Sequence, residues 1–132
     1  MGILIDTSVL VAAERGKLEL EPLLARLGGE EVAIASITAS ELLHGVHRLR
    51  GASRARSDVL VERLLDRLPV VDFDLAAARV HATLSAELRA RGTPVGAHDL
   101  LIAATAVLRD DAVATRDLRS FPRIKGLRVL HW

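Results

Sequence analysis

Four acidic residues lie where predicted strands end or where the following helices begin, and carboxylates gathered in this way can bind a divalent cation. Carboxylates that lie close together repel one another, so one of them takes up a proton unless a cation neutralises the group. Oxygen ligands in a chain without cysteine favour Mg²⁺ or Mn²⁺ over Zn²⁺. A cation held in this way activates a water molecule and binds phosphate oxygens, which is the chemistry of phosphodiester hydrolysis. The four residues are Asp6, Glu41, Asp99 and Asp117.

Each of these acids also has a purely structural interpretation. Asp6 can cap the helix that follows it. The segment Thr38-Ala39-Ser40-Glu41 matches a capping box, in which Glu41 would reach back to the helix start. Asp99 suits a helix N-terminus because of the helix dipole, and Asp117 suits a turn. Capping is the better interpretation of any one acid taken alone, whereas four acids at one edge of a sheet favour a shared site.

The shared site requires a parallel sheet, and the alternation of predicted elements supplies one. Uninterrupted apolar runs such as Ile3-Leu4-Ile5 are typical of strands that are buried on both faces. Strands that alternate with helices predict an α/β fold with a mainly parallel sheet and helices on both faces, in which ligands bind at the carboxyl ends of the strands. The predicted strands are 3–5, 32–37, 70–73, 112–114 and 127–130.

Helices are predicted between these strands from their apolar stripes and their end signals. Asp74 is a predicted N-cap, and Gly51, Gly92 and the pair Gly28-Gly29 are predicted helix stops. The predicted helices are 8–15, 20–27, 39–49, 53–68, 75–91 and a last one that begins at 97 or 98 and ends at 109.

Composition places the chain among globular domains. Its 132 residues suffice for one domain, 1–132, and half of them are hydrophobic. The chain has no cysteine, no apolar run that could span a bilayer and no signal-peptide pattern, so we expect a cytoplasmic protein without a membrane segment. The three aromatic residues are Phe73, Phe121 and Trp132, which argues against a base-stacking surface for single-stranded nucleic acid.

The charges suit a polyanionic substrate although the net charge is only +1. Without the four acids named above, 13 acidic residues remain against 18 basic ones, and 16 of the basic residues are arginine, which binds phosphate in bidentate fashion. A basic surface around an acidic cleft would attract RNA. A solvated surface is an equally good interpretation of any single arginine. The arginines group at 48, 50, 54 and 56 and at 116, 119 and 123.

Several segments, in order and with matching spacing over nearly the whole chain, resemble the PIN-domain family and, within it, the VapC-type toxins of bacterial toxin–antitoxin systems. These segments are Ile5-Asp6-Thr7-Ser8, Ser40-Glu41-Leu42-Leu43-His44-Gly45-Val46, His98-Asp99-Leu100-Leu101-Ile102-Ala103-Ala104-Thr105-Ala106, Ala114-Thr115-Arg116-Asp117 and the stretch 121–129. The resemblance implies a five-stranded parallel sheet and a Mg²⁺-dependent endoribonuclease. It also implies a homodimer that a small VapB-type antitoxin inhibits within a hetero-oligomer.

The same resemblance assigns roles to individual residues. It implies metal and catalytic roles for Asp6, Asp99 and Asp117 and a catalytic role for Glu41, which either completes the metal shell or orients the attacking water. Thr7 and Thr115 would be supporting hydroxyls. The family often has a further acid where this chain has Ser120, so that loop has lost peripheral acidity.

Other functions remain open on the sequence. A DNA nuclease or a structure-specific nuclease would use the same acids, and a non-catalytic RNA-binding PIN module would have the same fold. Glu41-x-x-His44 has the spacing found in di-iron bundles, but the chain has no second Glu-x-x-His.

An inhibitor could place a basic side chain among the acids and dock its apolar face on a neighbouring groove. The side chains expected to line that groove are Leu10, Leu42, Val46 and Leu60.

Overall fold

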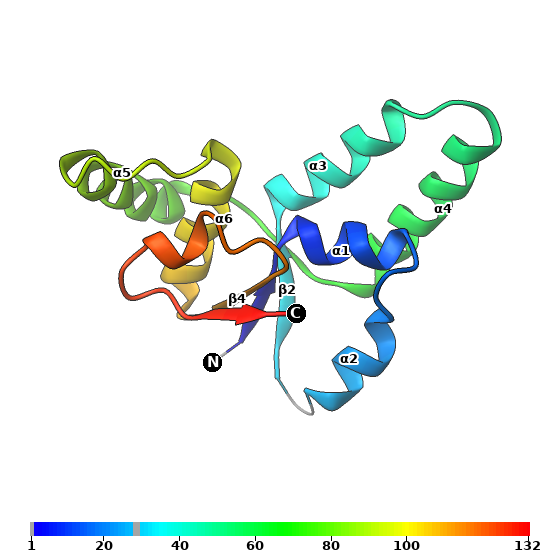
Figure 1. Cartoon of the computed structure of the whole chain (residues 1–132), viewed down its shortest axis with the longest axis horizontal. Coiled ribbons are helices and arrows are strands. Elements are labelled where there is room, and N and C mark those ends of the chain that lie inside the picture. The colour runs from blue at the N-terminus through cyan, green and yellow to red at the C-terminus, as the bar shows by residue number, and fades with distance from the viewer. Residues whose placement is uncertain (1, 28–29) are drawn as a thin grey trace.

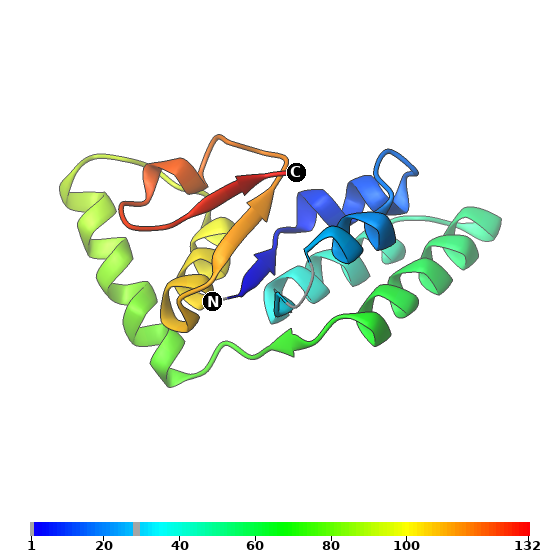
Figure 2. The same cartoon turned by 90° about the horizontal axis from the view of Figure 1, so that it is seen from below.

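The computed structural model, which describes residues 2–27 and 30–132, contains one parallel sheet in the order β3-β2-β1-β4-β5 (Figures 1 and 2). β1 lies at its centre, where Leu4 pairs with Ala33 of β2 on one side and with Val113 of β4 on the other. The sheet confirms the predicted α/β class with five parallel strands. The strands are β1 (Ile3–Ile5), β2 (Val32–Ala35), β3 (Val70–Val71), β4 (Ala112–Thr115) and β5 (Val129–His131).

Helices cover both faces of the sheet, as predicted. In Figure 1, α5 and α6 lie on one side and α1, α2, α3 and α4 lie on the other. Asp74 caps α5 by accepting a hydrogen bond of 2.9 Å from the backbone nitrogen of Ala77, as predicted. The helices are α1 (Thr7–Glu14), α2 (Leu20–Arg26), α3 (Ser36–His47), α4 (Gly51–Arg67), α5 (Leu75–Ala90) and α6 (Ala97–Arg109), and a 3₁₀ helix spans Phe121–Arg123.

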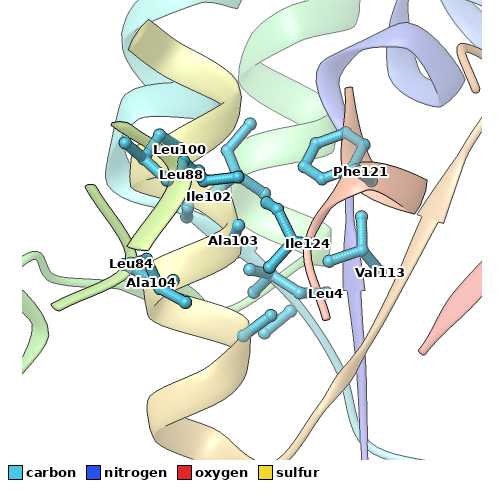
Figure 3. Packing of buried hydrophobic residues seen from close by; sticks show 13 residues of the cluster. Leu4, Leu84, Leu88, Leu100, Ile102, Ala103, Ala104, Val113, Phe121 and Ile124 are labelled. Carbon is cyan, nitrogen blue, oxygen red and sulfur yellow. The ribbon is translucent and has the colours of Figure 1, made fainter. Parts of the chain in front are cut away.

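Alternate side chains of β1 enter two separate cores. Leu4 packs with Val113 and with residues of α5, α6 and the 3₁₀ helix (Figure 3). Ile3 and Ile5 pack with residues of α1, α3 and α4 on the opposite face. A strand that is buried on both faces cannot alternate apolar and polar residues, and this explains the run Ile3-Leu4-Ile5.

Several element boundaries differ from the prediction. β2 ends at Ala35, and α3 begins at Ser36 instead of 39. The sequence did not predict this boundary, because apolar residues continue across it to Ile37 without a stop signal. Gly51 was predicted to end a helix, but α3 ends at His47 and Gly51, with φ of 58°, is the first residue of α4. β5 begins two residues later than predicted. The predicted stop at Gly28-Gly29 falls outside the described residues.

None of the helices in 2–27 and 30–132 has the combined length and apolar character that crossing a bilayer requires.

Candidate active site

The acids predicted to converge come from four separate segments of the chain and lie at the carboxyl edge of β1 and β4. Asp6 follows β1 directly, and its backbone nitrogen extends the pairing with β4 by donating to the Ala114 carbonyl over 2.8 Å. Asp117 lies two residues beyond β4, Glu41 lies in α3, and Asp99 lies in the first turn of α6. Their proximity appears in the electrostatics, because Asp6, Asp117 and Glu41 each raise the pKa of Asp99.

Asp6 is fixed by hydroxyl groups and does not cap α1. Its side chain is only 5% exposed, and its Oδ2 accepts hydrogen bonds from Ser8 Oγ over 2.7 Å and from Thr115 Oγ1 over 2.8 Å. The start of α1 receives no side-chain cap, so the capping interpretation of Asp6 is wrong. Within the described part of the chain, Oδ1 of Asp6 has no hydrogen-bond partner and is available to a ligand.

Thr115 and Ser8 join the two central strands at this edge. The backbone nitrogen of Asp117 donates to Thr115 Oγ1 over 3.0 Å, and the backbone nitrogen of Arg116 donates to Ser8 Oγ over 3.0 Å. The two hydroxyl oxygens lie 3.2 Å apart. The loop after β4 is thus tied to the carboxylate of Asp6. The structure places Thr115 where a supporting hydroxyl was predicted and adds Ser8, which the sequence reasoning missed.

Glu41 faces Thr7 and His98 and does not cap α3. Its Oε1 accepts a hydrogen bond of 2.8 Å from Thr7 Oγ1, and its Oε2 lies 3.4 Å from Nδ1 of His98. The predicted capping box does not form, because α3 begins at Ser36 and Thr38 already lies inside its first turn. The Thr38 hydroxyl is buried and, within residues 2–27 and 30–132, has no hydrogen-bond partner.

The negative charge of the neighbouring acids affects the pKa of Asp99. Burial raises the pKa of its carboxyl above the usual value, and repulsion from Asp6, Asp117 and Glu41 raises it further, against a hydrogen bond from Ser120 that lowers it. A cation bound beside Asp99 would relieve this repulsion. Asp99 also lies in the first turn of α6, where the helix dipole favours an acid.

Asp117 differs from the other acids because an arginine holds it. Arg119 Nε lies 2.8 Å from Oδ1, and Arg119 Nη2 lies 2.6 Å from Oδ2. The backbone nitrogen of Arg119 also donates to Oδ1 over 3.0 Å, so the predicted turn role of Asp117 is present as well. These hydrogen bonds lower the pKa of Asp117 to about 2.

The carboxylate oxygens of these acids suit a hard divalent cation, but the side chains do not surround one common point. No three acidic or histidine side chains in the described ranges form a group that could hold a metal ion together. Mg²⁺ is usually bound through one or two carboxylates, with waters and substrate phosphates as its other ligands, so it does not need three. The free Oδ1 of Asp6 and the raised pKa of Asp99 fit such a cation, while the carboxylate of Asp117 is occupied by Arg119.

The rival cluster of Glu41 and His44 does not form. The histidine near Glu41 is His98, on α6, and His47 Nδ1 instead lies 3.1 Å from Arg54 Nη2. The structure also places Arg15 and Arg48 in a cleft of about 510 Å³ between α1 and α3, which Glu41 also lines. Basic side chains therefore lie in a cleft that adjoins the acids at the carboxyl edge of the sheet.

The predicted lining of an apolar groove for an inhibitor is wrong for three of the four residues. Leu10, Leu42 and Val46 are core side chains, with exposed fractions of 0%, 3% and 4%, because they pack onto the sheet. Leu60 is exposed and lines a different groove of about 370 Å³, between α4 and the segment that connects α1 to α2. The other apolar residues of this groove are Ala13, Leu18, Leu20 and Leu64.

Comparisons with known proteins match the chain over nearly its full length. A family model of the PIN domain matches residues 3–127. The tRNA(fMet)-specific endonuclease VapC of Salmonella typhimurium is 35% identical over 129 residues, which cover 98% of this chain and 96% of that protein. Ribonuclease VapC1 of Rickettsia felis is 32% identical over 131 residues, with the same shares.

Solved structures match as closely. VapBC2 from Rickettsia felis, bound to a DNA fragment from its promoter, has a TM-score of 0.90 and 26% identity, and the match covers 100% of this chain and 99% of that chain. DNA-bound VapBC from Salmonella typhimurium has a TM-score of 0.89 and 34% identity, with 100% and 98% covered.

Proposed function

The chain belongs to the PIN-domain family and, within it, to the VapC ribonucleases, and from this premise we propose that Asp6, Asp99 and Asp117 hold a Mg²⁺ or Mn²⁺ ion with which the protein cleaves RNA as a toxin. The relatives confirm the predicted PIN-like fold and the nuclease class. PIN-domain ribonucleases generally depend on a divalent metal. We take residues 1–132 as one PIN domain.

The observation that carries the proposal is the set of contacts that links the acids across four segments of the chain. Thr115 Oγ1 joins the Asp6 carboxylate to the backbone nitrogen of Asp117, and Glu41 Oε2 lies 3.4 Å from Nδ1 of His98, the residue before Asp99. Asp6, Glu41 and Asp117 also raise the pKa of Asp99. Acids that served only as caps would each face the backbone of their own helix. The described contacts of Asp6 and Glu41 instead point to neighbouring side chains.

Each residue has a distinct task in this proposal. When bound, a divalent cation offsets the charge of the phosphate and lowers the pKa of a water molecule. Asp6 presents Oδ1 to the cation because Ser8 and Thr115 hold its Oδ2. Thr7 holds Oε1 of Glu41, so Oε2, which also faces Nδ1 of His98 at 3.4 Å, would orient the attacking water. Arg15 and Arg48 bind flanking phosphates in the cleft that Glu41 shares.

The proposed partner is a VapB-type antitoxin, since the structural neighbours are VapBC complexes. An antitoxin segment with apolar side chains would dock in the groove that Leu60 lines and would place a basic side chain among the acids. Because the neighbours are bound to DNA as complexes, their DNA does not indicate DNA cleavage by this chain. We place the protein in the cytoplasm, where its RNA substrates would be found, and expect it to form a homodimer and a hetero-oligomer with the antitoxin.

A cleavage assay on RNA and DNA of one sequence tests the proposal. The first RNA should be an initiator tRNA transcript, because the Salmonella relative is named for that target. We expect Mg²⁺-dependent cleavage of RNA alone, its loss in EDTA and a fall of about a hundredfold or more for Asp99→Asn, because a bound cation contributes several kcal/mol to transition-state stabilisation. Asp58→Asn, at an exposed position of α4, is the matched control and should cleave normally.

The outcomes separate the competing functions. Cleavage of the DNA at a similar rate would favour the DNA or structure-specific nuclease. Binding of RNA without cleavage in any metal would favour the non-catalytic module. Equal cleavage of RNA in EDTA, or by Asp99→Asn, would overturn the metal mechanism. Sequencing of RNA ends after expression of the chain alone would then identify its targets.

A further inference from the structure

Arg119 occupies both carboxylate oxygens of Asp117. Its Nε lies 2.8 Å from Oδ1 and 3.1 Å from Oδ2, and its Nη2 lies 2.6 Å from Oδ2. Its backbone nitrogen adds a fourth contact, 3.0 Å from Oδ1. A cation that approached Asp117 would therefore meet a guanidinium group that already neutralises the carboxylate.

The other acids of the site are held differently. Hydroxyl groups hold Asp6 and one oxygen of Glu41, whose other oxygen lies 3.4 Å from Nδ1 of His98. Within the described residues, no arginine or lysine pairs with either acid. The negative charge of these carboxylates thus remains available to attract a cation. Arg119 brings a full positive charge, so it acts on Asp117 as a bound cation would.

The Arg119 side chain can move away from Asp117. It is 87% exposed, whereas the side chain of Asp117 is 34% exposed, so no packing of the guanidinium fixes the pair. Exposed ion pairs are weak and are screened by salt. The pair can therefore open when a competing cation binds.

We propose that Arg119 competes with a divalent cation for Asp117, so that the cation binds this carboxylate only after the guanidinium has left it. The inference rests on the metal role proposed above for Asp117. It makes Arg119 a built-in counter-ion that weakens the affinity of the site for the cation.

Mn²⁺ binding, followed by electron paramagnetic resonance of the free ion, tests the competition without any measurement of cleavage. Wild type and Arg119→Ala are compared with Arg116→Ala, which removes an arginine from the same loop that donates to the Trp132 carbonyl and not to an acid. We expect Arg119→Ala to bind Mn²⁺ a few-fold more tightly than Arg116→Ala, because an exposed ion pair is weak and its loss removes only a small competing interaction. The advantage should shrink in high salt.

A second pair of variants shows whether the effect acts through Asp117. In an Asp117→Asn background, Arg119→Ala should no longer change the Mn²⁺ affinity. Equal affinities of Arg119→Ala and Arg116→Ala, or the same gain with Asp117→Asn, would overturn the competition while leaving the metal proposal intact. Absence of Mn²⁺ binding by wild type and by every variant would overturn both.

Discussion

Thr115 offers a direct test of how the acidic edge is held together. Its side chain is fully buried, and its hydroxyl donates to Asp6 Oδ2 over 2.8 Å while accepting from the backbone nitrogen of Asp117 over 3.0 Å. Thr115→Val keeps the shape of the side chain and removes both interactions. The loss should lower the free energy of unfolding and should also release the loop that carries Asp117.

The size of the effect follows from the kind of bond that is lost. A hydrogen bond to a charged group contributes about 1.5–3 kcal/mol, and the Asp117 nitrogen can recover part of its loss from water. We therefore expect Thr115→Val to lower the free energy of unfolding by about 2–3 kcal/mol. For a domain of this size that corresponds to a fall in Tm of roughly 6–12 °C.

Denaturant unfolding in EDTA measures this loss, with Thr105→Val as the matched control. Thr105 is also buried, but its hydroxyl donates to the neutral carbonyl of Leu101 within α6, over 2.9 Å. The control should lose only about 1 kcal/mol. A loss for Thr115→Val no larger than that of the control would refute the claim that a charged hydrogen bond joins β1 to β4 at this edge.

Three further predictions concern charge, association and inhibition. Because burial and the neighbouring carboxylates raise the pKa of Asp99, its ionisation opposes folding as the pH rises through that pKa. In EDTA at pH 7, Asp99→Asn should thus unfold at the same or a higher denaturant concentration than wild type. Any gain in the free energy of unfolding should vanish below about pH 4. A clear loss of stability in Asp99→Asn at pH 7 would contradict this. Light scattering should give a homodimer at micromolar concentration. Leu75→Asp, at a position 67% exposed on α5, should weaken the dimer more than the control Leu118→Asp does. A monomer both free and antitoxin-bound would refute the dimer. A candidate antitoxin should bind the double variant Asp6→Asn, Asp99→Asn more weakly than wild type and with a smaller salt dependence, whereas equal binding with the same salt slope would exclude inhibition through the acids.

The convergence of the acids could be predicted because it follows from topology. The carboxyl ends of parallel strands share one edge of the sheet, so Asp6 after β1 and Asp117 after β4 were expected at the same edge once the strands were identified. The strand order, which makes β1 and β4 neighbours, came from the structure. The apolar runs that identified the strands arise from burial on both faces. The contacts between Thr7 and Glu41 could not be predicted, since they depend on how α1 packs against α3 and no local pattern encodes that packing.

Side-chain burial and loop contacts were harder to foresee. Leu10, Leu42 and Leu60 are equivalent in sequence terms, yet only Leu60 is exposed, because the helix orientation relative to the sheet decides which leucine reaches the core. The ion pair between Arg119 and Asp117 depends on a turn of irregular backbone, for which the sequence has no periodic signal. The early start of α3 was missed because Ala35-Ser36-Ile37 continues the composition of β2.

The central claim is that acids from separate elements form one cation site, and a titration of Mn²⁺ into metal-free protein tests it most directly. Saturable binding by wild type and by the control Asp58→Asn, with its loss in Asp6→Asn and again in Asp99→Asn, is the predicted result. Each single change should be sufficient, because both carboxylates act on the same cation. Mn²⁺ affinity that is unchanged in either Asp6→Asn or Asp99→Asn would contradict the claim.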